Sequence, residues 1–352
     1  MKKAILTKIF ALFILLGFGL QPEVNAQDPQ FTQYYAAPLY LNPAFTGTTG
    51  QHRASVNYRN HWSSLPRAFV TYAFAYDYNL PSSNSSVGVI FSTDRAGTAN
   101  LSSTNVGAIY SYTIPINDKI RAVPALQVGY LSQSMDFSKL VFGDQLAFGN
   151  PDAPTTDPDV RNLNSRNRFD FGSGLLVYNN SFWAGFALHH INQPNRSVLE
   201  GESELPMRMT VHAGWKIRLK QGPLKSGIES SINPSFNFRR QGRFDQLDLG
   251  FNYYYRMLML GLWYRGIPLQ QDMPRTINHD ALAVSFGLSM HNLNFGYSYD
   301  MTVSKLGPAS SGGSHEVSLV LQMQFSKRPG KVSRKDKYNP CPAFMPNYLW
   351  KP

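Results

Sequence analysis

Residues 212–220, with the sequence HAGWKIRLK, alternate between apolar and polar side chains. Successive side chains of a β-strand point to opposite faces, so this stretch forms a strand with one apolar face and one polar face. The apolar face carries Ala213, Trp215, Ile217 and Leu219. The polar face carries His212, Lys216, Arg218 and Lys220. Residues 228–239 repeat the pattern, with Ile232 and Phe236 opposite Asn233 and Asn237.

About fourteen segments of this kind follow one another, at residues 51–60, 68–79, 86–94, 101–114, 119–132, 168–178, 181–190, 208–219, 226–239, 244–254, 257–266, 280–290, 293–303 and 314–325. Short turns are expected at residues 80–85, 115–118, 179–180, 221–225, 255–256 and 291–292. Longer connections are expected at residues 135–167, 191–207, 267–279 and 304–313. Short and long linkers alternate in this way in bacterial outer-membrane barrels. The sequence therefore predicts an all-β fold, a transmembrane antiparallel β-barrel of about 14 strands.

A soluble β-sandwich would show the same alternation, but the N-terminus of the chain favours the barrel. Three lysines precede an apolar run at residues 9–20, and the small-residue site Val24-Asn25-Ala26 follows it. This pattern predicts a secretory signal peptide over residues 1–26, cleaved after Ala26. Residue 27 is Gln rather than Cys, so a lipid-anchored lipoprotein is not expected. No other stretch approaches the ~20 apolar residues of a membrane helix.

The last segment and the composition point the same way. Apolar residues occupy every second position of that segment, at Val317, Leu319, Leu321, Met323 and Phe325. This resembles the closing strand of an outer-membrane barrel. Charged residues make up 16% of the chain, against ~25% in a typical soluble protein. The 19 Tyr and 23 Phe residues suit aromatic girdles at the two membrane boundaries.

Charged side chains on the strands are expected to face the lumen, because a charge facing lipid at mid-bilayer costs ~2–4 kcal/mol. These residues are Arg208, Lys216, Arg218, Glu229, Arg239, Asp248, Arg256 and Asp300. Residues 27–50 lack the alternation of a strand. They are expected to form either a plug inside the barrel or an ordered periplasmic lead-in before it.

The sequence shows no catalytic constellation, so we expect a protein that is not an enzyme and has no cofactor and no metal site. His189 and His190 are expected in an aromatic girdle, and His212 is expected to be a hydrogen-bonded structural residue on the polar wall. The single cysteine, Cys341, has no partner for an internal disulfide. No Cys/His cluster has zinc spacing, and no phosphate-binding glycine loop is present.

Residues 326–352 form a basic tail that follows the barrel, with seven Lys or Arg residues against one Asp. An even strand number leaves this tail in the periplasm. We expect it to be a docking peptide, in which charge steers a partner and aromatic side chains anchor it. The expected partner-binding residues are Lys327, Arg328, Lys331, Arg334, Lys335, Lys337, Tyr338, Phe344, Tyr348 and Trp350. The alternative is a frayed terminus near anionic lipid. An exported protein is a poor candidate for binding nucleic acid.

Two N-terminal motifs carry a family resemblance. Residues 28–35 read DPQFTQYY, and residues 38–47 read PLYLNPAFTG. Together with residues 58–62 (YRNHW), and with Asp94 and Gly97 after Gly88, they resemble the PorP/SprF family of Bacteroidota. Thr32 replaces the usual Ser of that family, and His61 replaces its Gln. The positions that match the N-terminal motifs are Asp28, Pro29, Phe31, Gln33, Tyr34, Asn42, Pro43 and Gly47.

The resemblance implies a non-enzymatic outer-membrane barrel of the type IX secretion and gliding-motility machinery. Its expected partners are the periplasmic ring and lipoprotein subunits, the C-terminal domain of a secreted adhesin-type cargo, and outer-membrane lipid. Two alternatives stay open. One is a passive channel for small or hydrophobic compounds, and the other is an outer-membrane enzyme with candidate residues His189, His190 and His212.

Overall fold

The computed structural model describes residues 28–50, 52–66, 68–80, 83–136, 138, 140–147, 154–156, 166–197, 203–220, 230–273, 276–304, 307–323 and 341–343. The predicted signal peptide and all but three residues of the predicted tail lie outside these ranges. The strands are β1 (His52–His61), β2 (Phe69–Leu80), β3 (Ser85–Ala96), β4 (Leu101–Tyr112), β5 (Ile114–Pro115), β6 (Arg121–Ser134), β7 (Arg166–Tyr178), β8 (Phe182–His189), β9 (Arg208–Trp215), β10 (Ile217–Lys220), β11 (Ser230–Gln241), β12 (Phe244–Tyr255), β13 (Leu258–Met273), β14 (Thr276–Met290), β15 (Leu293–Thr302) and β16 (Ser314–Met323).

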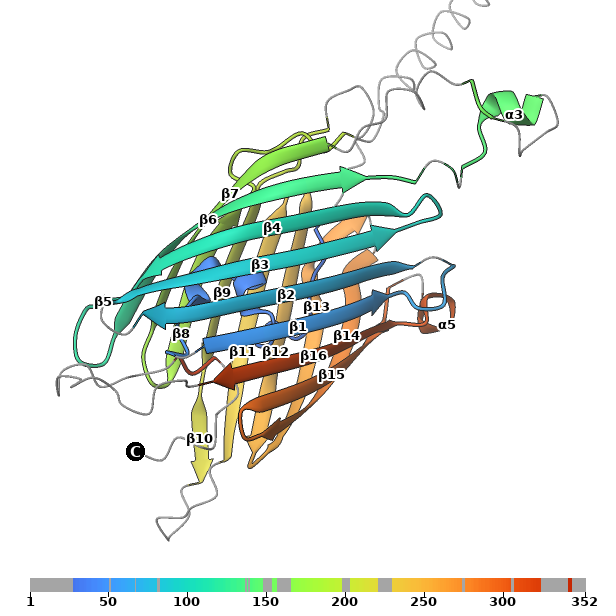
Figure 1. Cartoon of the computed structure of the whole chain (residues 1–352). Coiled ribbons are helices and arrows are strands. Elements are labelled where there is room, and N and C mark those ends of the chain that lie inside the picture. The colour runs from blue at the N-terminus through green and yellow to red at the C-terminus, as the bar shows by residue number, and fades with distance from the viewer. Residues whose placement is uncertain are drawn as a thin grey trace, which may run out of the picture.

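These strands close into a tilted cylinder (Figure 1). Each strand pairs antiparallel with its sequence neighbours, and β1 pairs with β16 to complete the ring, with Val56 opposite Leu319. β9 and β10 are separated only by Lys216 and both pair with β11. β4 and β5 are separated only by Thr113 and both pair with β6. The wall is therefore a closed 14-strand antiparallel barrel, and the predicted strand number is confirmed.

The two faces of the wall are the reverse of those of a soluble protein. On β3 the outward side chains Val87, Val89 and Phe91 are 43%, 46% and 40% exposed. On β1 the inward Arg53 and Arg59 are each only 2% exposed. In water, a continuous apolar exterior of this kind would make the protein associate with other molecules. Hydrocarbon is the environment that the alternating pattern of the sequence predicts.

As predicted, short turns lie at one end of the barrel and most of the long connections lie at the other. Short turns join β7 to β8 at residues 179–181, β12 to β13 at residues 256–257 and β14 to β15 at residues 291–292. We call this end the inner mouth and the opposite end the outer mouth. Connections of a dozen residues or more at the outer mouth include residues 135–165 and 190–207. The short helices α3 (Gly143–Ala147) and α5 (Gly307–Ser311) lie in outer connections.

One predicted outer loop is wrong. Residues 267–279 were expected to be a loop, but β13 and β14 continue through them and leave only residues 274–275 between the two strands. The pairing shifts register at Arg265/Gly266 and again between Ile267 and Gln271. These irregularities accommodate Pro268, whose lack of an N–H otherwise argues against a strand.

The predicted lumen charges mostly face inward. Arg208, Asp248 and Asp300 are at most 9% exposed within the barrel. Lys216 is only half-buried and Arg218 on β10 is exposed. Arg256 is also exposed, because it occupies the β12–β13 turn with a φ of 52° and its guanidinium lies 5.8 Å above the Tyr255 ring. A turn position directs this side chain away from the lumen. Glu229 falls outside the described ranges.

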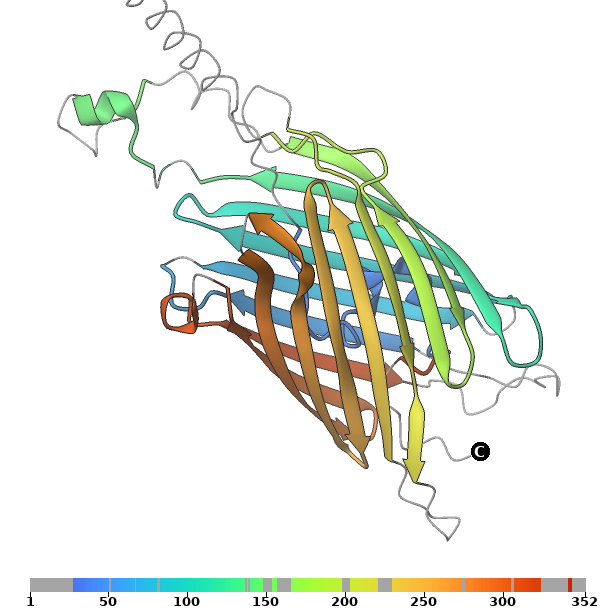
Figure 2. The same ribbon diagram turned by 180° about the vertical axis from the view of Figure 1, so that it is seen from behind.

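Residues 28–50 lie inside the barrel and contain two short helical turns, α2 (Pro38–Leu41) and η1 (Pro43–Phe45) (Figure 2). Their apolar side chains pack on the wall in two clusters. In the larger one, Leu39, Ala44 and Phe45 meet residues such as Val123 and Leu176. In the smaller one, Tyr35 and Ala36 meet Tyr254, Met259 and Val320. Among the described residues, none of the helices is both long enough and apolar enough to span a bilayer. We refer to residues 28–50 as the luminal segment.

Candidate functional site

The luminal segment runs the length of the barrel, and its two ends mark the two mouths. Asp28 contacts Arg208 and Gln241, which are the first residue of β9 and the last of β11. Both positions are at the outer mouth. Gly47 contacts Asp77, near the inner end of β2. The segment therefore enters at the outer mouth, passes along the lumen and joins β1 at the inner mouth.

Cationic and amide groups hold Asp28 at the outer mouth, and Arg196 Nη1 lies 3.7 Å from its Oδ1. Its Oδ2 accepts hydrogen bonds from His190 Nε2 at 2.7 Å and Arg208 Nη1 at 3.0 Å, and from Gln241 Nε2 at 3.1 Å. Burial by itself would raise the pKa of Asp28, but His190 and Arg208 outweigh it and hold the pKa well below its usual range. The carboxylate is therefore charged.

His190 bridges two carboxylates, because its Nδ1 also contacts Asp170 Oδ1 at 2.9 Å. Burial by itself would lower the pKa of His190, but Asp28 and Asp170 raise it to about 9. The predicted girdle position of His189 and His190 is wrong, since the two residues are 3% and 5% exposed inside the barrel. The two histidines are buried because they face the Asp28 carboxylate of the luminal segment. The alternation of the strand could not reveal this contact.

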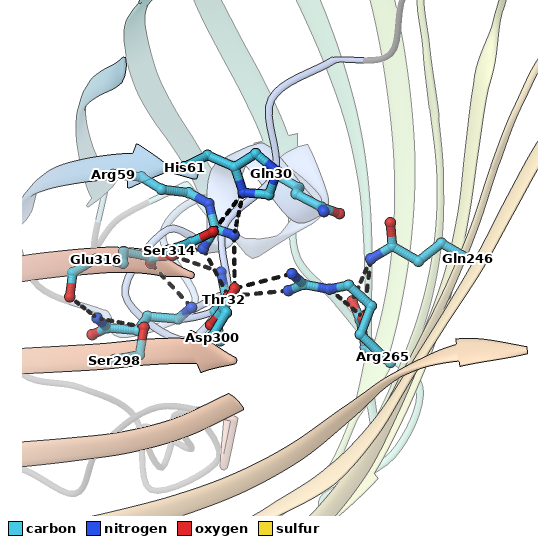
Figure 3. A network of polar contacts seen from close by, with 12 residues as sticks. Gln30, Thr32, Arg59, His61, Gln246, Arg265, Ser298, Asp300, Ser314 and Glu316 are labelled. Atoms are coloured by element: carbon cyan, nitrogen blue, oxygen red, sulfur yellow. Dashed lines mark hydrogen bonds and ion pairs between the residues drawn. The ribbon is translucent and has the colours of Figure 1, made fainter. Parts of the chain in front are cut away.

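Thr32 is the centre of a second cluster, shown in Figure 3. Its Oγ1 donates to Asp300 Oδ2 at 2.7 Å, and it accepts from Arg59 Nη1 at 2.8 Å and Arg265 Nη2 at 3.0 Å. Both arginines also contact Asp300 Oδ2, at 2.7 and 3.0 Å. One hydroxyl thus lies between charged groups from β1, β13 and β15.

Glu316 on β16 binds the backbone of the same motif. Its Oε2 accepts from the Thr32 N–H at 2.7 Å, and its Oε1 accepts from the Gln33 N–H at 3.0 Å. Arg59 Nη1 lies 3.0 Å from Glu316 Oε2. The Gln33 side chain donates to the Glu316 carbonyl at 3.0 Å and accepts from Ser318 at 2.6 Å. These charge-assisted contacts compensate a fully buried carboxylate.

Asn42 ties the middle of the luminal segment to the wall. Its Oδ1 accepts from the Ala44 N–H at 2.8 Å and so caps η1. Its Nδ2 lies 3.1 Å from His212 Nε2, which confirms His212 as a hydrogen-bonded structural residue. Gly174 on β7 makes room for this side chain, because a Cβ there would lie 2.1 Å from Asn42 Oδ1.

Gly47 fixes the inner end of the luminal segment. Its N–H donates to Asp77 Oδ2 at 2.7 Å, while Asp77 Oδ1 accepts from Arg53 Nε at 2.7 Å. Gly47 has a φ of +71°, and a Cβ there would lie 2.0 Å from Ser86 Oγ. Both the backbone conformation and the close approach to the wall require glycine.

Three residues of the C-terminal tail also lie inside the inner mouth. Cys341, Pro342 and Ala343 are buried, and the Cys341 N–H donates to the Thr48 carbonyl at 3.1 Å. Asn233 Nδ2 on β11 lies 3.5 Å from the Pro342 carbonyl. The Cys341 thiol is free, and burial raises its pKa to about 12. This contact gave no signal in the sequence.

The other motif residues contact the wall or one another. Phe31 packs on Tyr40 with ring centroids 5.4 Å apart. The Tyr34 hydroxyl is 2.7 Å from Ser235 Oγ, and its ring meets Trp263 edge-on at 4.9 Å. Pro43 opens η1, and Pro29 lines a cavity at the outer mouth. The ten predicted partner-binding residues of the tail lie outside the described residues.

Only some of the wall residues that hold the motif were named from the sequence. Arg59, His61 and the charged Asp300 were quoted, but Asp77, Arg265 and Glu316 were not. Asp77, Arg265 and Glu316 could have been found in the sequence, because each is a charged residue at an inward-facing strand position. Within the described part of the chain, no group of three or more His, Cys, Asp or Glu side chains is arranged to hold a metal ion. The charged and amide groups of this site therefore hold the luminal segment against the barrel wall.

A protein-family model described as "Type IX secretion system membrane protein PorP/SprF" matches residues 23–321. Comparison with curated proteins gives no match.

Among solved structures, the chain is similar to the CymD monoaromatic hydrocarbon channel, at 12% identity and a TM-score of 0.44, covering 82% of this chain and 93% of that one. The P. putida toluene transporter TodX is similar at 10% identity and a TM-score of 0.43, with 81% and 93% covered. The Acinetobacter baumannii outer membrane protein Omp33 is similar at 9% identity and a TM-score of 0.39, with 78% and 98% covered.

Proposed function

The chain belongs to the PorP/SprF family of type IX secretion system membrane proteins, and from that premise we propose that it is a sealed, non-enzymatic outer-membrane barrel that binds other secretion proteins. The proposed partners are periplasmic ring and lipoprotein subunits at the inner mouth and the C-terminal domain of a secreted adhesin-type cargo at the outer mouth. The luminal segment acts as a plug. Function then resides in the two mouths and not in transport through the lumen.

The occupied lumen is the observation that carries this proposal. Leu39, Ala44 and Thr46 of the luminal segment are each at most 1% exposed. Buried ion pairs and hydrogen bonds of 2.7–3.1 Å hold the segment at Asp28, at Thr32 and at Gly47. Displacing it would leave buried charges without partners, which costs several kcal/mol for each pair broken.

Conductance tests the sealed lumen against the passive-channel alternative. The wild-type protein in a planar lipid bilayer should show no steady open-pore current. A variant with Thr32→Ala and Gln33→Ala, which removes side-chain anchors of the plug, should show intermittent openings. A steady ohmic current from the wild-type protein would favour the passive channel and defeat the plug.

The basic tail is the proposed contact with periplasmic subunits. Cys341 and Ala343 inside the inner mouth support this, because they fix part of the tail at the end of the barrel with the short turns. Deleting residues 327–352 should leave the barrel assembled in the membrane and abolish co-purification of periplasmic partners.

A second variant separates charge from anchoring. Replacing Lys327, Arg328, Lys331, Arg334, Lys335 and Lys337 by Gln retains Cys341–Ala343 and removes the basic charge. Loss of partners in this variant as well supports electrostatic docking by the tail. Undiminished co-purification after the full truncation would defeat the docking proposal.

A further inference from the structure

A cavity of about 590 Å³ opens above the luminal segment at the outer mouth. Pro29 and Gln30 of the luminal segment form part of its lining, together with the outer ends of β1, β2, β3, β11, β12 and β14. We call this cavity the outer cup. Its volume falls within the range of about 300–1,000 Å³ typical of small-ligand sites. It can therefore hold a short peptide segment but not a folded domain.

Two aromatic side chains of the outer cup face inward and are left uncovered. Phe69 on β2 is 43% exposed and shares its face with Thr71, which is only 3% exposed. Phe244 on β12 is 45% exposed and shares its face with Asp248, which is 7% exposed. Lipid cannot cover side chains on the lumen face. These rings are therefore apolar surface in water, at the place where an outside ligand arrives first.

Trp62 adds a third ring in a strained conformation. It follows β1 with a φ of 59°, which costs a bulky residue of the order of 1–2 kcal/mol. Its ring lies 4.4 Å from the His61 ring and meets the Phe69 ring edge-on at 5.9 Å. Strain of this kind is found where the surrounding structure holds a residue in position for binding.

Two carboxylates of the outer cup make no direct ion pair with a described residue. Asp94 accepts a hydrogen bond from Thr71 Oγ1 at 2.6 Å, and Asp280 lies across the cup on β14. Within the described ranges, no Lys, Arg or His nitrogen is within 4.0 Å of either carboxylate. Arg239 bonds instead to the side-chain amides of Gln30 and Gln246. A cation would complement the two carboxylates and could also lie on an aromatic face.

We propose that the outer cup binds a short segment of an exported polypeptide that carries a basic side chain next to an aromatic or large apolar one. The inference rests on the proposed function and specifies which surface of the outer mouth takes the cargo. The basic side chain pairs with Asp94 or Asp280. The neighbouring apolar side chain packs on Phe69, Trp62 or Phe244.

Peptide binding to the full-length protein in nanodiscs tests the proposal. The probe is a fluorescent, end-capped pentapeptide Gly-Phe-Lys-Phe-Gly, and its counterpart has Glu in place of Lys. The Lys peptide should bind wild type at least about tenfold more tightly than the Glu peptide. Asp94→Asn combined with Asp280→Asn should abolish this preference. Equal binding of the two peptides by wild type, or no binding, would overturn the proposal whatever the variants do.

Phe69→Ala tests the aromatic contact, and Phe91→Ala is its matched control. Phe91 is 40% exposed on β3 but faces the outside of the barrel. Phe69→Ala should weaken binding of the Lys peptide several-fold, and Phe91→Ala should leave it unchanged. Equal effects of the two changes would count against the outer cup.

Co-purification of secretion partners from cells separates this inference from the proposed function. If wild type captures partners but does not bind the Lys peptide, the outer cup is wrong and the proposed function stands. If wild type captures neither secretion proteins nor cargo, the proposed function fails on its own test.

Discussion

At the scale of single residues, the hydroxyl of Thr32 connects the luminal segment to three strands that are far apart in the sequence. It bonds to Asp300, Arg59 and Arg265, which come from three strands. Each of these partners is at most 4% exposed. A small hydroxyl that both donates and accepts can lie between like and unlike charges, where a second charge could not. This explains why a hydroxyl residue stands at this place in the N-terminal motif.

Asp300→Ala tests the cluster around Thr32. The change leaves Arg59 and Arg265 buried without their shared carboxylate, which should lower the free energy of unfolding by about 3–5 kcal/mol. Urea unfolding in detergent micelles measures it. The matched control is Asp118→Asn, because Asp118 is exposed in an inner turn. If Asp300→Ala unfolded at the same urea concentration as this control, the cluster would contribute nothing to stability.

The His190–Asp28 contact should depend on pH. The pKa of His190 is raised from 6.5 to about 9, so its stabilising effect is full below pH 6.5 and is lost as pH rises through about 9. The pKa of Asp28 is lowered, so its effect is lost only as pH falls below the usual 3.8. Hydrogen exchange of residues 28–33, corrected for the intrinsic rate, should therefore accelerate between pH 6.5 and 9.5.

His190→Gln is the control for this pH dependence. It removes the titrating group and keeps a hydrogen-bonding side chain, so exchange of residues 28–33 should be the same at both pH values. A wild-type protein whose corrected exchange is also flat would show that His190 is not the titrating anchor.

The sequence could not predict which wall residues contact which residues of the luminal segment. Period-two alternation identifies Glu316 and Arg59 as inward-facing, and the motif resemblance identifies Gln33. Neither the alternation nor the resemblance can identify the contacts of these residues, because Thr32 and Glu316 are 284 positions apart in the chain. Such pairing depends on the register of the closed ring, which no local pattern carries.

At the scale of elements, the strands were predicted well because each has a strong alternating signal. β6 (Arg121–Ser134), for example, was expected at residues 119–132. The outer extension of β13 and β14 was missed because its prolines and polar residues resemble a loop. The luminal segment has no periodic signal at all, so the sequence left its position inside or outside the barrel open.

Gly47→Ala should loosen the inner end of the luminal segment. The new Cβ would lie 2.0 Å from Ser86 Oγ and would also disfavour the φ of +71°. Gly97→Ala is the control, since Gly97 has the same φ with no atom within 4 Å of its Cβ position. Gly97→Ala should cost only the backbone strain of about 1–2 kcal/mol.

Limited proteolysis of the purified barrel compares the two variants. Cleavage within residues 28–50 should be faster in Gly47→Ala than in Gly97→Ala. Equal cleavage rates would mean that the close approach to Ser86 is relieved without moving the segment.

At the scale of the whole molecule, the barrel followed from the sequence because lipid imposes the same alternation on every strand. Closure through β1 and β16 was implied by an even strand number and a strand with an apolar face at each end. The arrangement inside the barrel did not follow, because lumen contacts are individual and not periodic. Cys341 at the inner mouth is the clearest case, since nothing near it in the sequence resembles a strand or a cap.

Replacing an outward-facing residue by arginine tests the lipid-facing exterior. Val284 lies midway along β14 and is 57% exposed. Val284→Arg should lower the unfolding free energy in lipid vesicles by ~2–4 kcal/mol. The control is Val303→Arg, one residue beyond the outer end of β15, where the cost should fall to about 0–1 kcal/mol. Equal small costs at both positions would mean that the exterior does not meet hydrocarbon.

The path of residues 28–50 also constrains how the protein is assembled. Pairing of β1 with β16 encloses the luminal segment, so the simplest order of assembly places the segment in the sheet before the seam closes. In that order, residues 28–50 lie against the open sheet while the remaining strands form around them. A folded domain fused ahead of Asp28 would have to lie beyond the outer mouth, because the luminal segment enters the barrel there.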